Sequence, residues 1–249
     1  SITDKIDTLV GFFGVNEKPS SSKDPYALRR TAIGIIRIII ENKRDLKIND
    51  LISYSSNIYL EQGFNFSNNT LQKDILNFLK DRFKYYLKEK GIRYDIIDAA
   101  SKALDLNRIS EVYEKTISLN KVINKSIGEN IVMSYKRALN ILNSETKNIG
   151  EKLTNTTDPG IFKNDYEKNL FKKINDLNQY FSGTLKKNNF DELLSSIATA
   201  KNEVFDFLDN VKVNDDNEVI KKNRLELLNF LCKTYENFID FQLIKDINE

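Results

Sequence analysis

Two short clusters of basic side chains are the features of this sequence best suited to binding chemistry. One is Lys136 with Arg137, and the other is Lys221-Lys222 with Arg224. Tyrosines accompany both clusters, at positions 135 and 235. Basic and aromatic groups together suit an RNA loop, because cations hold phosphates while unstacked bases stack on rings. The alternative is a solvated helix face whose tyrosines pack inward, and the clusters taken alone favour that alternative.

A second basic feature lies on an otherwise apolar stretch. Arg29, Arg30 and Arg37 occur within residues 25–42, which we predict to form a buried helix because apolar residues cover most of its circumference. An arginine pair near a helix N-terminus is unusual, since the helix dipole favours anions there. These arginines suit contact with phosphate or with an acidic partner domain. Internal ion pairing within a helical bundle is the alternative, and the bare pattern favours it.

The residue types used for acid–base and covalent catalysis are missing or isolated. Histidine is absent, which removes the commonest general base and metal ligand. The one cysteine, Cys232, lies beside an apolar helical stripe and is predicted to be a small buried side chain. Asp4 and Asp7 share a helix face, and Asp215-Asp216 lie in a turn, so both pairs are interpreted as non-catalytic. The sequence therefore predicts no catalytic residue.

Composition narrows the class of protein further. The 38 basic and 36 acidic residues nearly balance, so any basic surface must be local. Apolar residues make up 40% of the chain, which is enough for a core. No apolar run reaches the roughly 18 residues of a membrane span, and a single cysteine excludes an intrachain disulfide. These features predict a cytoplasmic protein that does not enter a membrane.

Helical periodicity dominates, and only three prolines occur, so we predict an all-α fold made of two helical-bundle blocks, 1–126 and 127–249. Asp24 followed by Pro25 predicts a helix start, and Gly91 a helix end. A single helix is expected to open at Asn189 and to continue past residue 208. The other expected helices span 48–62, 70–90, 94–104, 107–125, 130–143, 164–182 and 218–243, and 147–160 is a predicted loop.

Several runs carry a resemblance to one family. In the first block, three stretches resemble the β subunit of bacterial heterotetrameric glycyl-tRNA synthetases: 4–13, 22–39 and 83–99. In the second block, three more resemble the all-helical, DALR-type anticodon-binding domain shared by arginyl-tRNA synthetases and this β subunit: 134–142, 205–213 and 223–228. Each run is short, but together they follow the family order over nearly the whole chain. The resemblance is to the C-terminal, tRNA-binding part of the subunit.

The resemblance implies a domain organisation. Residues 1–18 would be the tail of an HD-type helical domain, 19–126 a helical linker or body domain, and 127–249 the anticodon-binding helical bundle. Asp4 is at a position similar to the last metal ligand of the HD-type domain, but the histidine partners are missing, so we expect no metal. No cofactor is expected in this chain, although the holoenzyme uses ATP.

The resemblance also implies a function. The family ligates glycine to its tRNA at the expense of ATP, and the adenylate-forming site belongs to a separate α subunit. The implied partners are tRNA(Gly) and that α subunit, in an α2β2 heterotetramer. The residues expected to face the RNA are Lys136, Arg137, Asn140, Lys222, Asn223 and Arg224. Arg29, Arg30 and Arg37 are assigned to the tRNA backbone or to contacts between domains.

Alternatives remain open at this stage. Asn223 and Arg224 can have a structural role instead of contacting RNA, because Arg224 can equally form an ion pair inside the bundle. Lys212 and Lys221-Lys222 depart from the family pattern, which is more apolar at the first position and richer in arginine at the others; lysine cannot make bidentate phosphate contacts. A second hypothesis is an assembly module in which the helices at 25–42 and 70–90 dock the α subunit or the rest of the β subunit. A third is a phosphohydrolase built on remnants of the HD-type domain, which the lack of histidine disfavours.

Overall fold

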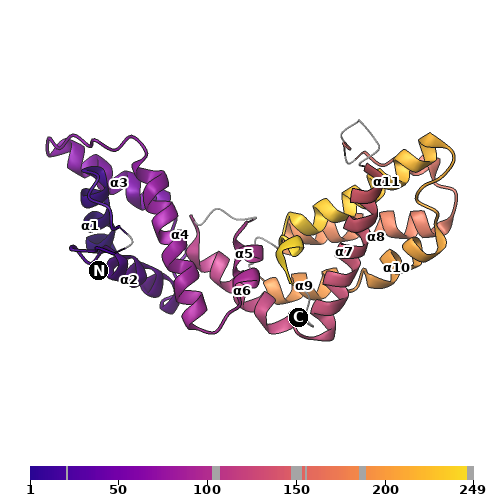
Figure 1. The fold of residues 1–249 in the computed structure, drawn as a ribbon, viewed down its shortest axis with the longest axis horizontal. Coiled ribbons are helices and arrows are strands. Elements are labelled where there is room, and N and C mark those ends of the chain that lie inside the picture. The colour runs from indigo at the N-terminus through magenta and orange to yellow at the C-terminus, as the bar shows by residue number, and fades with distance from the viewer. Residues whose placement is uncertain (21, 103–106, 147–152, 155, 185–188, 246–249) are drawn as a thin grey trace. The chain divides into compact units, whose positions relative to one another are not determined.

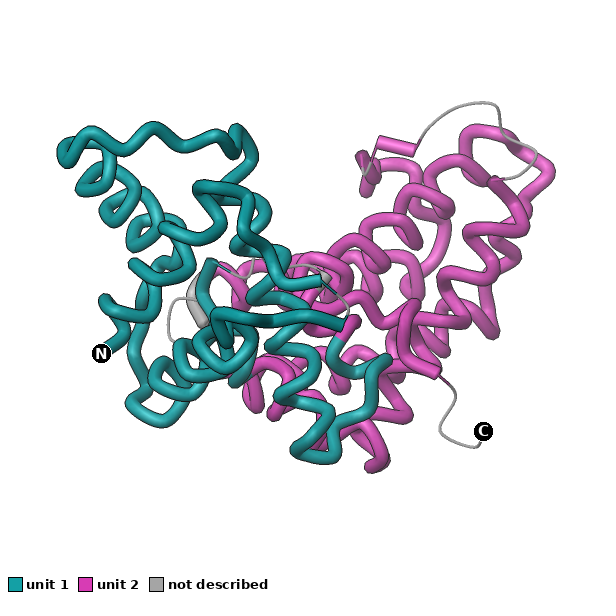
Figure 2. The backbone as a smooth tube through the Cα atoms, turned by 60° about the vertical axis from the view of Figure 1, so that its left-hand side comes forward, with its two compact units in different colours: residues 1–97, 104–114 teal, residues 98–103, 115–249 magenta. Residues whose placement is uncertain are grey.

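The computed structural model describes residues 1–20, 22–102, 107–146, 153–154, 156–184 and 189–245. All regular elements within these ranges are helices, which confirms the all-α prediction (Figure 1). The chain forms two compact units (Figure 2). Unit 1 comprises residues 1–97 and 104–114, and unit 2 comprises residues 98–103 and 115–249. The three-domain division drawn from the resemblance stays a prediction.

Unit 1 is a bundle in which one helix contacts three others. The buried residues of α1 (Ile2–Gly14) include Ile6, Leu9 and Phe13, at the three- and four-residue spacing of a helix face. That helix packs against the remaining members of the bundle, which are α2 (Leu28–Glu41), α3 (Ile48–Glu61) and α4 (Leu71–Glu89). Two further helices, α5 (Tyr94–Lys102) and α6 (Ile109–Val122), each contribute residues to both units.

The start of α2 corrects one prediction. The helix begins at Leu28 rather than at Pro25, because Ala27 adopts a left-handed backbone conformation with φ 55°. Asp24 still caps the helix from outside it: its carboxylate accepts hydrogen bonds from the backbone N–H groups of Leu28 at 2.8 Å and Arg29 at 3.1 Å. The cap predicted from the Asp-Pro pair is therefore present, but it acts across a tight turn.

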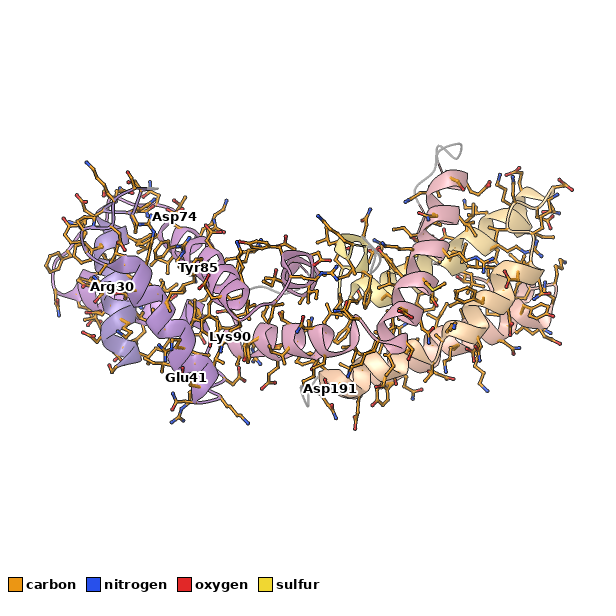
Figure 3. All side chains as sticks on the ribbon, turned by 60° about the horizontal axis from the view of Figure 1, so that its bottom comes forward. Arg30, Glu41, Asp74, Tyr85, Lys90 and Asp191 are labelled. Carbon is orange, nitrogen blue, oxygen red and sulfur yellow. The ribbon has the colours of Figure 1, made fainter. Side chains whose placement is uncertain are left out.

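A polar cluster fastens the loop before α4 to the end of α1. Asp74, labelled in Figure 3, has a carboxylate that accepts hydrogen bonds. The donors are Lys18 at 2.7 Å, Thr70 at 2.8 Å and Asn68 at 3.0 Å. The same Asn68 amide donates to the carbonyl of Phe13 at 3.1 Å. The hydrogen bond from Lys18, followed by those from Thr70 and Asn68, lowers the pKa of Asp74 to about 2. The cluster therefore stabilises the ionised carboxylate.

This cluster predicts an acid-dependent loss of stability in unit 1. Because the folded pKa of Asp74 lies below its ordinary value of 3.8, its contribution is present above pH 4 and is lost as the pH falls towards 2. Asp74→Asn should lower the free energy of unfolding at pH 7 by about 1 kcal/mol, since solvent screens this partly exposed group. It should also flatten the pH dependence between 4 and 2 in urea unfolding. Asp81→Asn, an exposed acid on the same helix, is the control and should leave both unchanged.

Unit 2 surrounds a central helix, α11 (Glu218–Glu236), in which nearly every side chain from Asn223 to Tyr235 is buried. It packs against α7 (Ser126–Thr146) and α8 (Asp165–Thr184), and α10 (Lys201–Asn210) packs on both of those. The remaining elements of the unit are α9 (Phe190–Ala198) and the short 3-10 helices η1 (Pro159–Ile161) and η3 (Phe241–Leu243). The central position of α11 decides which of its basic residues can reach a ligand.

Two predicted helices of unit 2 are corrected. The single helix expected from Asn189 past residue 208 is interrupted, because the N–H groups of Thr199 and Ala200 bond three residues back and end α9. The N-cap at Asn189 is confirmed, since its side chain accepts the N–H of Glu192. The last helix ends at Glu236 rather than at residue 243, and the chain then turns into η3.

Candidate nucleic-acid interface

Arg224 is enclosed by the bundle rather than presented to solvent. Its side chain is 7% exposed, and its Nε donates to Glu167 Oε1 at 2.7 Å. One terminal nitrogen donates to Asp215 Oδ2 at 2.7 Å and to the carbonyl of Lys212 at 2.9 Å. Glu167, only 1% exposed, also accepts the backbone N–H groups of Lys163 and Asn164 at the start of α8. Arg224 thus joins three segments of unit 2, as in the internal-pairing alternative.

Asn223 and Glu226 hold neighbouring loop segments in the same way. The Asn223 amide donates to the carbonyl of Asp158 at 3.0 Å and accepts its N–H at 2.8 Å. Glu226 accepts the N–H of Thr154 at 2.9 Å. Both side chains are buried, so these polar groups of α11 position the loops that precede α8. Direct RNA contact by Asn223 and Arg224 remains a prediction that no finding tests, and their burial favours an indirect role.

The two tyrosines that accompany the basic clusters pack inward. Tyr135 and Tyr235 are fully buried and stack with ring centroids 6.2 Å apart, and Phe241 contacts both rings. The hydroxyl of Tyr135 donates to Glu236 at 2.9 Å. Burial raises the pKa of both tyrosines. These rings form part of the core and are not available to stack on bases, so the inward-packing alternative is correct for them.

A different aromatic residue accompanies Arg137 on the surface. The Arg137 guanidinium pairs with Asp209 of α10 and lies over the Phe205 ring, with 5.1 Å between Cζ and the ring centroid. The ammonium of Lys201 lies 5.9 Å from the same centroid. Phe205 is half-buried, so part of its ring reaches solvent. The outer face of α7 and α10 therefore combines two cations with an accessible ring, which is the arrangement sought in an RNA-binding surface.

Sequence reasoning missed Phe205 and Lys201 as candidate functional residues. Phe205 falls within the single helix predicted from Asn189 past residue 208, and that prediction does not contain the break between α9 and α10. Lys201 and Phe205 are four residues apart on α10, so they lie on one helix face. This spacing is the feature of the sequence that could have identified them as a cation–aromatic pair. We name the set Lys136, Arg137, Asn140, Lys201 and Phe205 the α7/α10 face.

The remaining predicted residues of unit 2 lie at the surface. Lys136 is half-buried on α7, and Asn140 is exposed one turn further along. Lys222 is exposed in the second turn of α11. The neighbouring Lys221 lies 3.5 Å from Glu145 of α7, which brings the start of α11 beside the end of α7. The structure thus gathers Lys136, Arg137 and Asn140 on one helix, with Lys222 near its carboxyl end.

The three arginines of α2 differ in their surroundings. Arg29 donates to the carbonyl of Ser20, and Arg37 pairs with Glu41 of the same helix at 3.0 Å. Arg30 is exposed (Figure 3). Arg30 and Arg37 are seven residues apart, so they lie on the same solvent-facing side of the helix. Their proposed contact with a tRNA backbone or another domain stays a prediction.

Two of the acidic residues noted in the sequence, Asp7 and Asp215, have structural partners. Asp7 accepts a hydrogen bond from Ser55 at 2.6 Å, which joins α1 to α3. Asp215 accepts the N–H of Asn217 and pairs with Arg224, and these contacts lower its pKa. In the part of the chain that the structure describes, no three His, Cys, Asp or Glu side chains gather as a metal site would require. Nor does any helix of the described ranges have the length and hydropathy to cross a membrane.

Cys232 is buried on α11, and burial raises the pKa of its thiol to about 12. We expect the folded chain to react with a thiol reagent at pH 8 on the order of 1,000-fold more slowly than the unfolded chain, because so little thiolate is present. Since Cys232 is the only cysteine, labelling counted by mass spectrometry reports on this site alone. Rapid stoichiometric labelling of the native chain would show that the thiol is accessible.

Comparison with known families accounts for most of the chain. Residues 1–102 match the family model described as the glycyl-tRNA synthetase beta subunit. Residues 131–245 match the model of the DALR anticodon binding domain. The chain belongs to the glycyl-tRNA synthetase β-subunit family. The order of the two matches is that of the resemblance found in the sequence, and the DALR match contains all of the α7/α10 face.

Curated relatives agree with this assignment. A glycine–tRNA ligase β subunit of Rickettsia felis is 35% identical over 242 residues, which is 97% of this chain and 34% of the relative. The corresponding protein of Cereibacter sphaeroides is 32% identical over 245 residues, which is 98% of this chain and 35% of the relative. The chain therefore spans about a third of the length of the curated relatives it matches.

Proposed function

We propose that unit 2 binds the anticodon loop of a glycine tRNA, as part of a ligase that uses ATP to join glycine to that tRNA. The observation that carries the proposal is the match of residues 131–245 to an anticodon-binding domain. We take glycine as the amino acid because the relatives are named glycine–tRNA ligase β subunits. The protein would act in the cytoplasm, where tRNA is charged.

The α7/α10 face is the surface that we assign to the RNA. Its cations would neutralise phosphates of the loop, and the Phe205 ring would accept an unstacked base. Glycine anticodons end in two cytosines. A splayed cytosine presents an amino donor at N4 and acceptors at O2 and N3, so the amide of Asn140 and the ammonium of Lys136 can read its edge. Lys222 would extend the basic surface beyond the end of α7.

The buried residues of α11 would act indirectly. Arg224 fixes the start of α8 and the 212–215 turn, and Asn223 fixes the backbone at Asp158. A rigid scaffold of this kind is needed because a base-reading surface must hold its donors and acceptors to within a fraction of an ångström. These two residues are therefore positioning residues in the proposal rather than RNA contacts.

Binding to a glycine tRNA transcript, with a second transcript altered at one anticodon cytosine, tests this function. The chain should lose about 5- to 100-fold in affinity per changed cytosine, which corresponds to roughly 1–3 kcal/mol. Affinity for both should fall steeply with salt, because phosphate contacts release counterions. Equal affinity for the two transcripts would argue against anticodon recognition and leave only a general attraction to RNA.

A docking role is the second candidate, and one observation favours it. Tyr54 and Leu60 of α3 are 67% and 52% exposed, and Phe64 just after that helix is 54% exposed. Exposed apolar side chains of this size are common at protein interfaces. We propose that the α subunit covers them. Tyr54→Ser with Leu60→Ser should then abolish co-elution with the α subunit while leaving tRNA binding intact, whereas unchanged co-elution would place the contact elsewhere.

A further inference from the structure

The carboxyl-terminal half of α4 and the turn that follows it carry an unusual concentration of positive charge. Residues 80–94 contain six basic side chains and two acidic ones, Asp81 and Glu89. The basic positions are 80, 82, 84, 88, 90 and 93, and the last of them, Arg93, is paired with Asp95 of α5. Lys80, Lys84 and Lys88 follow one another at four-residue spacing, so they share one side of the helix.

Aromatic rings are interleaved with these cations. The Arg82 guanidinium lies 5.9 Å from the centre of the Tyr85 ring, Lys88 lies 5.0 Å from that of Tyr94, and Lys90 is 5.0 Å from that of Tyr86. Three cation–ring pairs within fifteen residues place a positive charge beside each of three tyrosines. Tyr85 lies in the last turns of α4, and Lys90 is the residue that caps its carboxyl end (Figure 3).

Two of the rings are accessible to a ligand. Tyr85 is 50% exposed and Tyr94 is 51% exposed, so each ring keeps a large free surface besides the part facing its cation. The opposite side of the helix is fully packed, since Leu79, Phe83 and Leu87 are buried against the bundle. In addition, the Nε–H of Arg82 is buried and has no acceptor within the described residues. A basic, aromatic surface on a packed helix is suited to an anionic, ring-containing ligand.

We propose that residues 80–94 form a second RNA-binding surface, which takes a single-stranded segment by stacking bases on Tyr85 and Tyr94 and neutralising its phosphates with the lysines of α4. Each ring accepts any base, and the cations recognise only the backbone, so the surface binds without strong sequence preference. The inference does not rest on the proposed anticodon function, because this surface belongs to unit 1. It would allow the chain to bind RNA at a second site, outside the anticodon loop.

The test measures binding of a fluorescent twelve-nucleotide oligouridylate, which has no stable structure of its own, to the full chain. All variants carry Phe205→Leu, so that stacking on the α7/α10 face is removed from the comparison. Tyr85→Leu and Tyr94→Leu should each weaken binding about 5- to 100-fold. Lys88→Ala should reduce the slope of log affinity against log salt by about 0.7, the value for one phosphate contact on a single strand.

Tyr54→Leu is the matched control, because it removes a tyrosine of unit 1 that is even more exposed and lies on α3. Its affinity should equal that of the parent. The proposal is overturned if the Tyr85 and Tyr94 variants bind like the parent. It is also overturned if polyglutamate competes as well as RNA and only the lysine variants weaken binding, since the surface would then recognise an acidic protein. Failure of either kind would leave the anticodon proposal untouched, because that proposal depends on Phe205 and on the anticodon bases.

Discussion

Arg224→Ala is expected to lower the free energy of unfolding by about 3–5 kcal/mol, the usual cost of breaking a buried ion pair from one side. The substitution leaves the Glu167 carboxylate, which is 1% exposed, without its charged partner. It also removes the donors to Asp215 and to the carbonyl of Lys212. A loss of this size is a large share of the stability of an ordinary domain. Urea unfolding followed by circular dichroism measures it.

Two comparisons make this result specific to the buried pair. Arg137→Ala removes an arginine whose pair with Asp209 is exposed on both sides, so it should cost no more than about 1 kcal/mol. Arg224→Met combined with Glu167→Gln should be less destabilised than the two single losses added together, because no fully buried charge is left unpaired. A cost below about 1 kcal/mol for Arg224→Ala would mean that the arginine is not enclosed as described.

Phe205→Leu is expected to weaken binding of a glycine tRNA about 5- to 100-fold, the effect of losing one ring that stacks on a base. Leucine keeps the apolar contact of a half-buried position and removes the flat ring, so the fold should be retained. Arg137→Ala should weaken binding of all tRNA sequences alike and reduce the salt slope by about 1, as the loss of one phosphate contact does. Equilibrium titrations at several salt concentrations separate the two effects.

Matched variants outside the α7/α10 face control for general damage. Phe162→Leu removes another partly exposed ring of unit 2, one that packs on Phe171. Lys168→Ala removes a cation that pairs with Asp165 on α8. Neither should change tRNA affinity by more than about twofold, because surface changes remote from a site have small effects. Equal losses in the control and test variants would remove the α7/α10 face as the binding surface.

Local signals predicted the helices of this chain well. The helices predicted at 48–62 and 70–90 correspond to α3 and α4 within a residue at each end, and Gly91 is left-handed just after α4. The incorrectly predicted helix ends lie where the backbone leaves the helical conformation at a residue other than glycine or proline. Ala27 turns left-handed before α2, and Thr199-Ala200 interrupts a helix that propensity alone would continue. Tertiary packing determines the backbone conformation at such residues, and the local sequence pattern carries no information about tertiary packing.

The candidate site was only partly predictable for a related reason. Whether a basic residue is free or enclosed depends on partners far away in sequence. Glu167 lies 57 positions before Arg224, and Asp209 lies 72 positions after Arg137. The sequence left both outcomes open for Arg224, and the structure encloses it. Phe205 was misjudged because a half-buried ring and a core ring share the same apolar character in a sequence.

The most direct test of the account is a thermodynamic cycle that combines Phe205→Leu with a change of one anticodon cytosine in a glycine tRNA. If the ring and the base contact each other, the two changes should be non-additive by about 1 kcal/mol or more. The same cycle with Tyr85→Leu should be additive, because that residue is not part of the α7/α10 face. Additivity of Phe205→Leu with every anticodon change, to within about 0.5 kcal/mol, would contradict the claim that unit 2 holds the anticodon on its α7/α10 face.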